Sequence, residues 1–464
     1  MPDTTQQPTI SPVAERVLTH APQRLRLEPP PAPVPDRHWN FLMACLAVYV
    51  LTAVGRVHQL FGVLELLHLT LLSAAAATGY LLLSDRGIRR TRPILRSFTT
   101  RAVLAIGLWI TLSIPGALWP GGAMHLLTDQ YAKAAVMFVV IASAVRGLRD
   151  VERLTFAYLA GVAFYAAMLL ARFRVGGGGG ESWRLGSLYY YDANEFATLA
   201  TMALPLGVYF LLRSGPLWRR AAAAGSLGVL TVAFIWAGSR GGFLALLAVG
   251  AFLLVRYTAV PVALRLGIAT MLVVVFAAAA SDTFWTEMRT ILKPQDDYNF
   301  TGDQGRVEVW KRGIGYMLDN PVLGVGGDNF PTAEGTLSPL AREASIGHGV
   351  KWSAAHNSFL EIGAELGFPG LFLFLAALGS GFAALRAVRR APSQRSSGAR
   401  SPPPRQLAQA LAAALLAYVV GGFFLSLAYH DMIYVLLALI VALHKVTVPG
   451  LRRRTRRAWS SSSF

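Results

Sequence analysis

The chain is poor in charged residues, and this scarcity excludes an ordinary water-soluble fold. Asp, Glu, Lys and Arg make up only 15% of its 464 residues, and the mean hydropathy is +0.46, whereas soluble domains carry about 25% charged residues. Cysteine is nearly absent too. The lone Cys45 excludes a disulfide framework and a cysteine-based metal site. What dominates instead is apolar sequence, at 54% of the chain.

Apolar stretches long enough to cross a bilayer recur along the chain. A helical span needs roughly 20 residues, and Gly and Pro interrupt several of the stretches. We predict an all-α polytopic membrane protein with twelve spans, at about residues 41–57, 60–83, 102–118, 130–146, 154–173, 196–213, 221–237, 241–256, 261–280, 366–388, 406–426 and 430–446. The predicted organisation is therefore a disordered polar tail (1–39), nine spans (40–280), a large loop (281–355), three spans (356–446) and a basic tail (447–464).

Lys and Arg are distributed unevenly between the two sides of this topology. With a cytoplasmic N-terminus, the inner segments hold 30 of the 43 Lys and Arg residues but only 7 of the 25 Asp and Glu residues. Cytoplasmic loops are the ones enriched in Lys and Arg, so we expect both termini in the cytoplasm. The pI near 10.5 then reflects topology and attraction to anionic inner-membrane lipids, and no nucleic-acid partner is expected.

The segment 281–355 is too long for a plain connection. Within it, GRVEVWKRGIGYML has apolar residues at a helical spacing, and Asn320-Pro321 is expected to end that helix. LSPLAREASI predicts a second helix, so the picture is a helical cap over the outer end of the bundle. Asp296, Asp297 and Asp303 are expected to be solvated acids, and no metal site is predicted.

Arginines in the outer segments are candidates for a functional role, because positive charge is disfavoured there. Arg184, Arg240 and Arg306 stand out, and Arg240 precedes Gly241 and Gly242, which permit close approach. Arginine forks bind phosphate oxygens in pairs, so several in one cavity would bind a diphosphate. The alternative is a snorkelling side chain or a headgroup contact. Further cations at or near the outer side are Arg312, Lys133, Lys351, Arg172, Arg174 and Arg289.

The dipeptide His356-Asn357 lies where the large loop meets the next span. A histidine takes up a proton near neutral pH, which suits a general base. The alternative is an interfacial histidine bound to a backbone carbonyl, with Asn357 or Ser358 capping the next helix. We interpret the scattered histidines His58, His68, His125, His348 and His430 as structural.

Four segments resemble the O-antigen ligase family, within the superfamily that also holds O-antigen polymerases and bacterial protein O-oligosaccharyltransferases. They are RLGSLYYYDANEFA, GSRGGFLAL, GRVEVWKRGIGYMLDNPVLGVGGDNF and AAHNSFLEIGAELGFPG. His356 and Gly367, with ten residues between them, fit a spacing of these ligases. The resemblance covers about residues 180–375, and the first spans and the tails match only in hydropathy.

The resemblance implies a definite reaction. Such ligases transfer a glycan from undecaprenyl diphosphate to the lipid A-core oligosaccharide, on the periplasmic face of the Gram-negative inner membrane, and their fold is similar to C-class membrane glycosyltransferases. His356 would be the base, with inversion at the sugar carbon and no metal or cofactor. The diphosphate would be bound by Arg184, Arg240, Arg306 and Arg312, with support from Asn194, Asn357, Lys351 and Lys133.

Three other readings remain open at this stage. An O-antigen polymerase uses the same donor but tends to have two sizeable outer loops, and here one dominates. A protein O-oligosaccharyltransferase often carries an extended soluble C-terminal portion, whereas this chain ends in a short basic tail. A lipid-linked glycan transporter would show symmetric halves and charge along a central pathway, whereas the notable polar groups here gather at the outer end.

Overall fold

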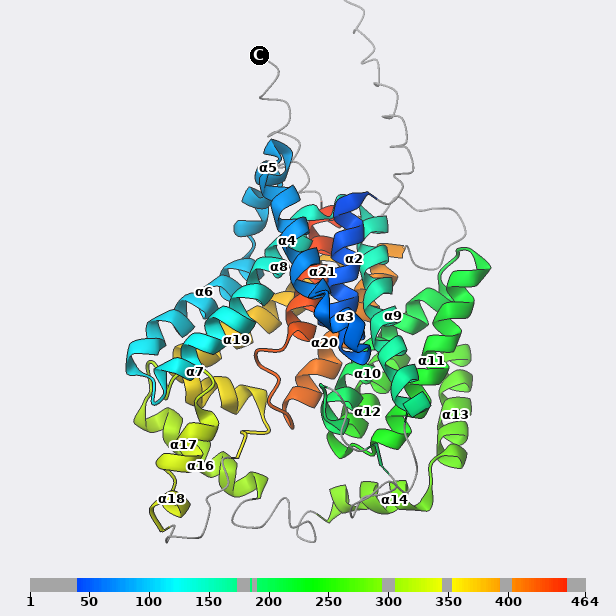
Figure 1. Ribbon diagram of the computed structural model, residues 1–464. Helices are drawn as coiled ribbons and strands as arrows, with labels where there is room; N and C mark the ends of the chain where they lie inside the picture. The colour runs from blue at the N-terminus through cyan, green and yellow to red at the C-terminus, as the bar shows by residue number, and fades with distance from the viewer. Residues whose placement is uncertain are drawn as a thin grey trace, which may run out of the picture. The chain divides into compact units, whose positions relative to one another are not determined.

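The computed structural model describes residues 40–172, 184–185, 190–293, 305–343, 353–392 and 403–448, which form helices and no strand (Figure 1). Residues 41–464 group into one unit. The predicted all-α class is therefore confirmed.

Each of the twelve predicted spans falls on a helix or on a run of helices. In chain order these are α2 (Phe41–Ala53), α3 (Gly62–Leu66) with α4 (Leu69–Leu82), α6 (Phe98–Ser113), α7 (Pro120–His125) with the π-helical η3 (Leu126–Tyr131) and α8 (Ala132–Ala144), α9 (Leu148–Arg172), α10 (Ala193–Leu212), α11 (Leu217–Ala237), α12 (Arg240–Arg256), α13 (Val262–Ala279), α19 (Ser358–Arg390), α20 (Pro403–Gly422) and α21 (Asp431–Thr447). An additional helix, α5 (Asp85–Leu95), follows α4.

Not every one of these helices is long enough to span a membrane alone. In the described part of the chain, seven are long and apolar enough, or eight if the bent pair 262–278 and 282–292 is one span. Helices α2, α12 and α21 have 13, 17 and 17 residues, fewer than the roughly 20 that a bilayer core requires. A polytopic membrane protein is thus established, and the count of twelve spans stays a prediction.

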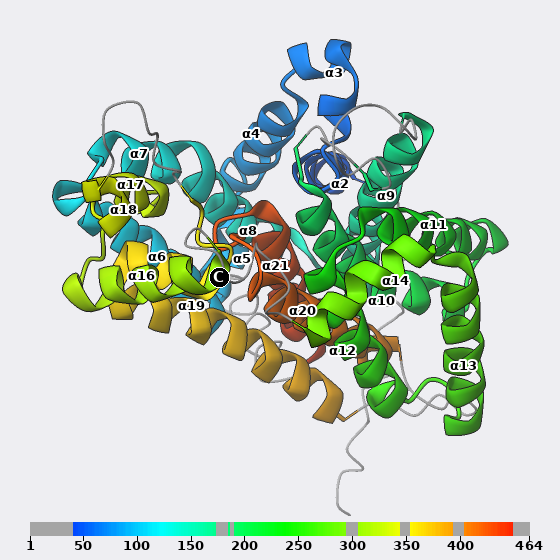
Figure 2. The same cartoon turned by 90° about the horizontal axis from the view of Figure 1, so that it is seen from below.

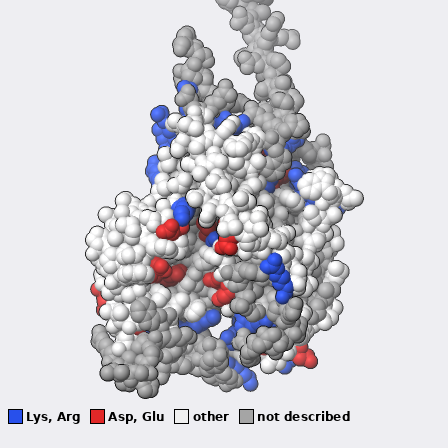
Figure 3. All heavy atoms as spheres, in the orientation of Figure 1, with Lys and Arg blue, Asp and Glu red and all other residues white. Residues whose placement is uncertain are grey.

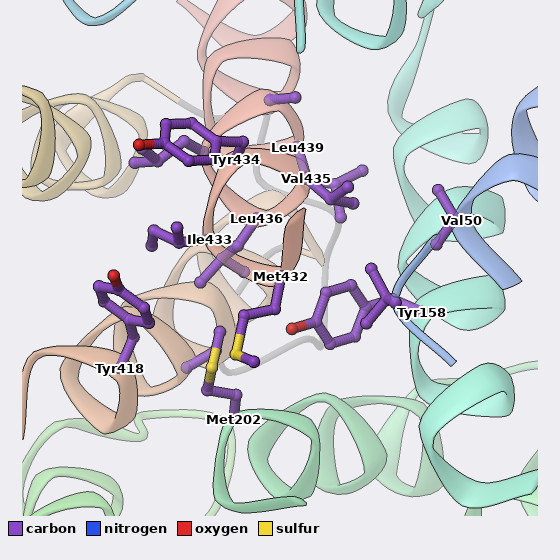
Figure 4. Close-up of a cluster of buried hydrophobic side chains, with 14 of the residues drawn as sticks. Val50, Tyr158, Met202, Tyr418, Met432, Ile433, Tyr434, Val435, Leu436 and Leu439 are labelled. Atoms are coloured by element: carbon purple, nitrogen blue, oxygen red, sulfur yellow. The ribbon is translucent and has the colours of Figure 1, made fainter. Parts of the chain in front are cut away.

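Helix α21 forms the centre of the hydrophobic core. Every residue from Met432 to Leu443 is buried, as expected for a helix that is apolar all round. It packs against α8, α9, α19 and α20, and Figure 4 shows Tyr158 of α9, Met202 of α10 and Tyr418 of α20 around its first turns. This packing fixes the start of α21, and with it the connection from α20.

Four short helices follow α13 at the end of the unit opposite α5 (Figures 1 and 2). They are α14 (Asp282–Arg289), α16 (Arg306–Asp319), α17 (Phe330–Thr336) and α18 (Pro339–Glu343). The predicted loop helix is α16, which ends just before Asn320-Pro321. The second predicted helix falls on α18, and its residues 344–346 lie outside the described residues. The sequence pattern did not indicate α14 or α17.

Gly367 breaks α19 and lets residues 321–326 pack onto it. Its φ of +67° and ψ of −171° are non-helical, in a region essentially restricted to glycine. The Phe368 N–H donates to the Pro321 carbonyl at 2.9 Å, and the Val325 N–H donates to the Ala364 carbonyl at 2.9 Å. A Cβ at Gly367 would lie 2.5 Å from the Pro321 oxygen. The backbone conformation and the close contact with Pro321 therefore explain why a glycine stands at position 367.

We expect Gly367→Ala to lower the free energy of unfolding by about 1–3 kcal/mol or more, because the backbone conformation is strained for alanine and the new methyl group clashes. Thermal unfolding of the detergent-solubilised protein measures the loss. Gly379→Ala in the same helix is the matched control, because no atom lies within 4 Å of a Cβ there. That substitution should be neutral or stabilise by up to about 1 kcal/mol, and equal unfolding temperatures for the two variants would contradict the role of Gly367.

Candidate active site

The connection between α20 and α21, residues 423–430, is held firmly in place; we call it the 423–430 loop. The Ser358 hydroxyl donates to the Leu425 carbonyl at 2.7 Å and accepts from the Leu427 N–H at 2.8 Å. The Tyr434 hydroxyl donates to the Ala428 carbonyl at 2.8 Å. The loop backbone is thus bonded to both α19 and α21, and the predicted site residues can be located relative to it.

His356 lies against the 423–430 loop. Its backbone N–H donates to the Ser426 hydroxyl at 3.0 Å, and the residue is half-buried. Its φ of +47° is left-handed, which costs a non-glycine residue about 1–2 kcal/mol, and such strain concentrates at functional sites. The next residue, Asn357, caps α19: its side-chain oxygen accepts from the N–H groups of Phe359 and Leu360. Asn357 therefore sets the position of His356 just ahead of the helix.

Arg240 starts α12 and borders the same loop. Helix α11 ends at Gly238 with φ +57°, and the Ser239 hydroxyl accepts from the Gly242 N–H at 3.1 Å, so a helix end is followed directly by the cap of α12. A Cβ at Gly241 would lie 3.1 Å from that of Phe424, so this turn approaches the 423–430 loop closely, as the glycines predicted.

The Arg240 guanidinium already has polar partners on α14 and on the residue that follows it. It donates to the Thr290 hydroxyl at 2.9 Å, and its Nε lies 3.4 Å from the Glu287 carboxylate. Both Arg240 and Glu287 are partly exposed, at 23% and 32% of the side chain. A partly exposed pair of this kind contributes only modest free energy.

Arg184 reaches this region from the segment before α10. Its Nε donates to the Ala237 carbonyl at 2.9 Å, and its Nη2 donates to the side-chain oxygen of Asn194 at 3.0 Å. One turn beyond Asn194, Thr198 contacts the end of α20, since a Cβ at Gly421 would lie 2.5 Å from its hydroxyl. Arg184 is thus positioned beside the turn that carries Arg240, and Asn194 holds it there.

Arg306 is brought to the loop by α16. Trp310, one turn further along, donates its indole N–H to the Ala355 carbonyl at 3.0 Å, and its ring lies 5.5 Å from that of Phe423. Residues four apart lie on one face of a helix, so Arg306 is on the face of α16 that packs beside His356. The structure therefore brings the segments that carry Arg240, Arg306 and His356 close to the 423–430 loop, and it places Arg184 beside the turn before Arg240.

The remaining predicted cations have other contacts. Arg312 makes a bidentate ion pair with Glu334, with Nη2 and Oε2 2.6 Å apart and side-chain exposures of 13% and 2%. Lys133 pairs with Asp129 four residues earlier, at 3.1 Å and half-exposed. Arg172 donates to the Leu60 carbonyl at 3.0 Å. Lys351 and Arg174 lie outside the described residues.

Sequence reasoning missed a polar group at the end of the same loop. Arg56 pairs with Asp431 at 3.3 Å, and its guanidinium lies 3.5 Å above the Tyr190 ring. His430, which we interpreted as structural, has Nε2 4.0 Å from the Glu195 carboxylate. Arg56 was overlooked because it falls inside the predicted span 41–57; the signal available was a cation at the outer end of an apolar stretch.

Two carboxyl groups of α19 were missed as well, those of the half-buried Glu361 and the buried Glu365. The Glu361 carboxylate accepts from the Ala428 N–H at 3.1 Å. Glu365 accepts from the Tyr429 hydroxyl at 2.8 Å and from the Phe330 N–H at 3.0 Å. They tie the 423–430 loop to α19 and to the start of α17.

On the face shown in Figure 3, acidic and basic side chains gather below an uncharged region of the surface.

The described residues form an all-helical polytopic membrane protein in which segments that carry arginines and a histidine lie near one loop. Residues 225–375 match the family model described as O-antigen ligase. This segment, about a third of the chain, is therefore similar to the O-antigen ligase family, in agreement with the resemblance stated from the sequence. The matched segment includes Arg240, Arg306, Arg312 and His356, whereas Arg184 precedes it. No curated protein matches the chain.

Proposed function

We propose that the protein is an O-antigen ligase that transfers a glycan from undecaprenyl diphosphate to the lipid A-core oligosaccharide, at the periplasmic face of the inner membrane. The observation that supports this most directly is that the segments carrying Arg240, Arg306 and His356 approach the 423–430 loop, with Arg184 beside the turn before Arg240. One titratable base beside several guanidinium groups is what transfer from a diphosphate to a hydroxyl requires.

In this proposal His356 accepts the proton of the attacking sugar hydroxyl, which is a weak nucleophile without a base. The hydroxyl oxygen forms a bond to the anomeric carbon as the bond to the diphosphate oxygen breaks, so the configuration inverts. Negative charge accumulates on the leaving diphosphate, and Arg184, Arg240 and Arg306 stabilise it. The donor linkage supplies the free energy, so no nucleotide or metal takes part in the proposed step.

The anchoring of these groups favours catalysis. Arg184 is held by Ala237 and Asn194, and His356 by Ser426. Charged donors that are already oriented need little reorganisation as charge develops, and this is where electrostatic catalysis gains most. Arg312 is engaged by Glu334, so we assign it to the support of α16 and leave the diphosphate to the other three arginines.

The test is expression in a Gram-negative host that lacks its own ligase, with the lipopolysaccharide separated on a gel. The expected result is a restored ladder of high-mass species, which Arg240→Ala should reduce by about 10²-fold, because one preorganised charged donor is lost. Arg289→Ala removes an exposed arginine from α14 and should keep the ladder.

An absent ladder despite abundant wild-type protein in the membrane would contradict the ligase proposal. The polymerase reading would then be tested with the same donor and a second lipid-linked glycan as acceptor. Equal ladders from Arg240→Ala and Arg289→Ala would remove Arg240 from the diphosphate site.

A further inference from the structure

A cavity of about 530 Å³ opens between the ends of α12, α19 and α20. These are the ends remote from the candidate active site, because α12 begins with Arg240 and α19 begins two residues after His356. The predicted topology puts this cavity on the cytoplasmic side. It shares no residue with the site proposed above.

Five arginines line this cavity, which we call the arginine pocket: Arg256, Arg386, Arg389, Arg390 and Arg405. The charges that act on the Arg389 guanidinium are those of Arg256, Arg386 and Arg390, all of the same sign. No carboxylate is among the lining residues. The sequence explains this, since residues 196–281 and 366–430 contain no Asp or Glu at all.

Such a cluster is unfavourable unless an anion joins it. Two like charges about 4 Å apart repel by about 4 kcal/mol at the dielectric typical of a protein surface, and distance and salt reduce this without reversing it. Arg405 donates one N–H to the Ala391 carbonyl at 3.0 Å, whereas its Nε is buried without a hydrogen-bond partner among the described residues. The pocket therefore offers positive charge and unused donors to a group with several oxygen acceptors.

The arginine pocket lies between helices joined by hydrogen bonds, and it also has apolar lining residues. The Gln409 amide of α20 donates to the Arg256 carbonyl at 2.6 Å and to the Thr258 hydroxyl at 3.1 Å, which locks α20 to the end of α12. Phe252 and Phe382 supply apolar lining next to the arginines. An amphiphile with a phosphate head matches both parts, and basic pockets between transmembrane helices on the cytoplasmic side are known to take such headgroups.

We propose that the arginine pocket binds the phosphate headgroup of an anionic phospholipid, with an acyl chain against Phe252 and Phe382. The bound lipid joins the far ends of α12 and α19, the two helices whose other ends carry Arg240 and follow His356. Binding therefore stabilises the bundle independently of any glycan transfer.

The test uses the full-length chain in detergent, with lipid binding followed by native mass spectrometry and by thermal unfolding. Phosphatidylglycerol should bind at least about tenfold more tightly than phosphatidylcholine and should raise the unfolding temperature. Arg386→Gln/Arg389→Gln/Arg390→Gln should lose this preference. Arg389→Gln alone should weaken phosphatidylglycerol binding about fivefold. This single variant replaces the triple variant in the test if the triple variant does not fold.

The matched control is Arg89→Gln/Arg92→Gln/Arg96→Gln, which makes the same charge change at exposed positions of α5 and its end and should keep the preference. Equal loss in the two triple variants would overturn the proposal in favour of general surface attraction. Inorganic phosphate at millimolar concentration should not reproduce the stabilisation; if it does, the occupant is a soluble anion and the lipid assignment is wrong.

Discussion

Replacing His356 by asparagine is expected to reduce glycan transfer by about 10²–10⁴-fold, the usual contribution of a positioned general base. Asparagine tolerates the left-handed backbone better than other residues, so it preserves the φ of +47° at this position while removing the base. The hydrogen bond from the backbone N–H to Ser426 does not depend on the side chain. The measurement is the initial rate of ladder formation, normalised to the amount of protein in the membrane.

His125→Asn is the control, because His125 is an exposed histidine beside Asp129 and should transfer at the wild-type rate. His356→Ala should lose as much activity as His356→Asn but unfold at a lower temperature, since alanine is strained at this backbone position. A near-normal rate in His356→Asn would refute the base assignment. A loss of activity that only matches a loss of folded protein would make His356 a structural residue.

Replacing Arg312 by alanine is expected to lower the free energy of unfolding by about 3–5 kcal/mol, because it leaves the Glu334 carboxylate buried and unpaired. Burial and the bond to Glu334 raise the pKa of the Tyr316 phenol, which stays protonated and donates to that carboxylate at 2.9 Å. One hydroxyl does not replace a bidentate guanidinium. The expected result is a lower unfolding temperature, with α16 and α17 more susceptible to protease.

Lys311→Ala provides the comparison at the adjacent position, where an exposed pair with Glu308 should contribute less than about 1 kcal/mol. Removing both partners, as Arg312→Met/Glu334→Leu, should recover much of the stability, since no buried charge remains. If Arg312→Ala keeps the wild-type unfolding temperature and loses transfer, then Arg312 acts on the diphosphate, as the sequence analysis first predicted.

Hydropathy and charge predicted the helical class, because each apolar stretch forms its helix from local residues alone. The start of α16 and the cap at Asn357 were also accessible to sequence reasoning, since spacing and capping are local. The 423–430 loop was not, because its role comes from contacts with Ser358, Glu361 and Tyr434, which lie on other helices.

Partners distant in the sequence explain the other misses. Glu334 follows Arg312 by 22 residues across a glycine-rich turn, and no local pattern indicates which arginine it neutralises. Arg56 meets Asp431 across 375 residues of chain. The sequence analysis used the arginines of the arginine pocket only to orient the chain in the membrane. Because they converge in space, the structure also indicates an anion-binding pocket.

The burial of α21 also constrains the order in which the protein assembles. This helix follows every other described helix in the chain, yet α8, α9, α19 and α20 pack against it. During synthesis the earlier helices enter the bilayer while the middle of the bundle is still unfilled, and helices that insert independently associate afterwards. The intermediate therefore exposes Tyr131, Tyr158 and other inward-facing side chains to lipid until α21 arrives. Biogenesis should consequently end in one late, cooperative closure, and the candidate active site should form only at that step, because the 423–430 loop is anchored by α21.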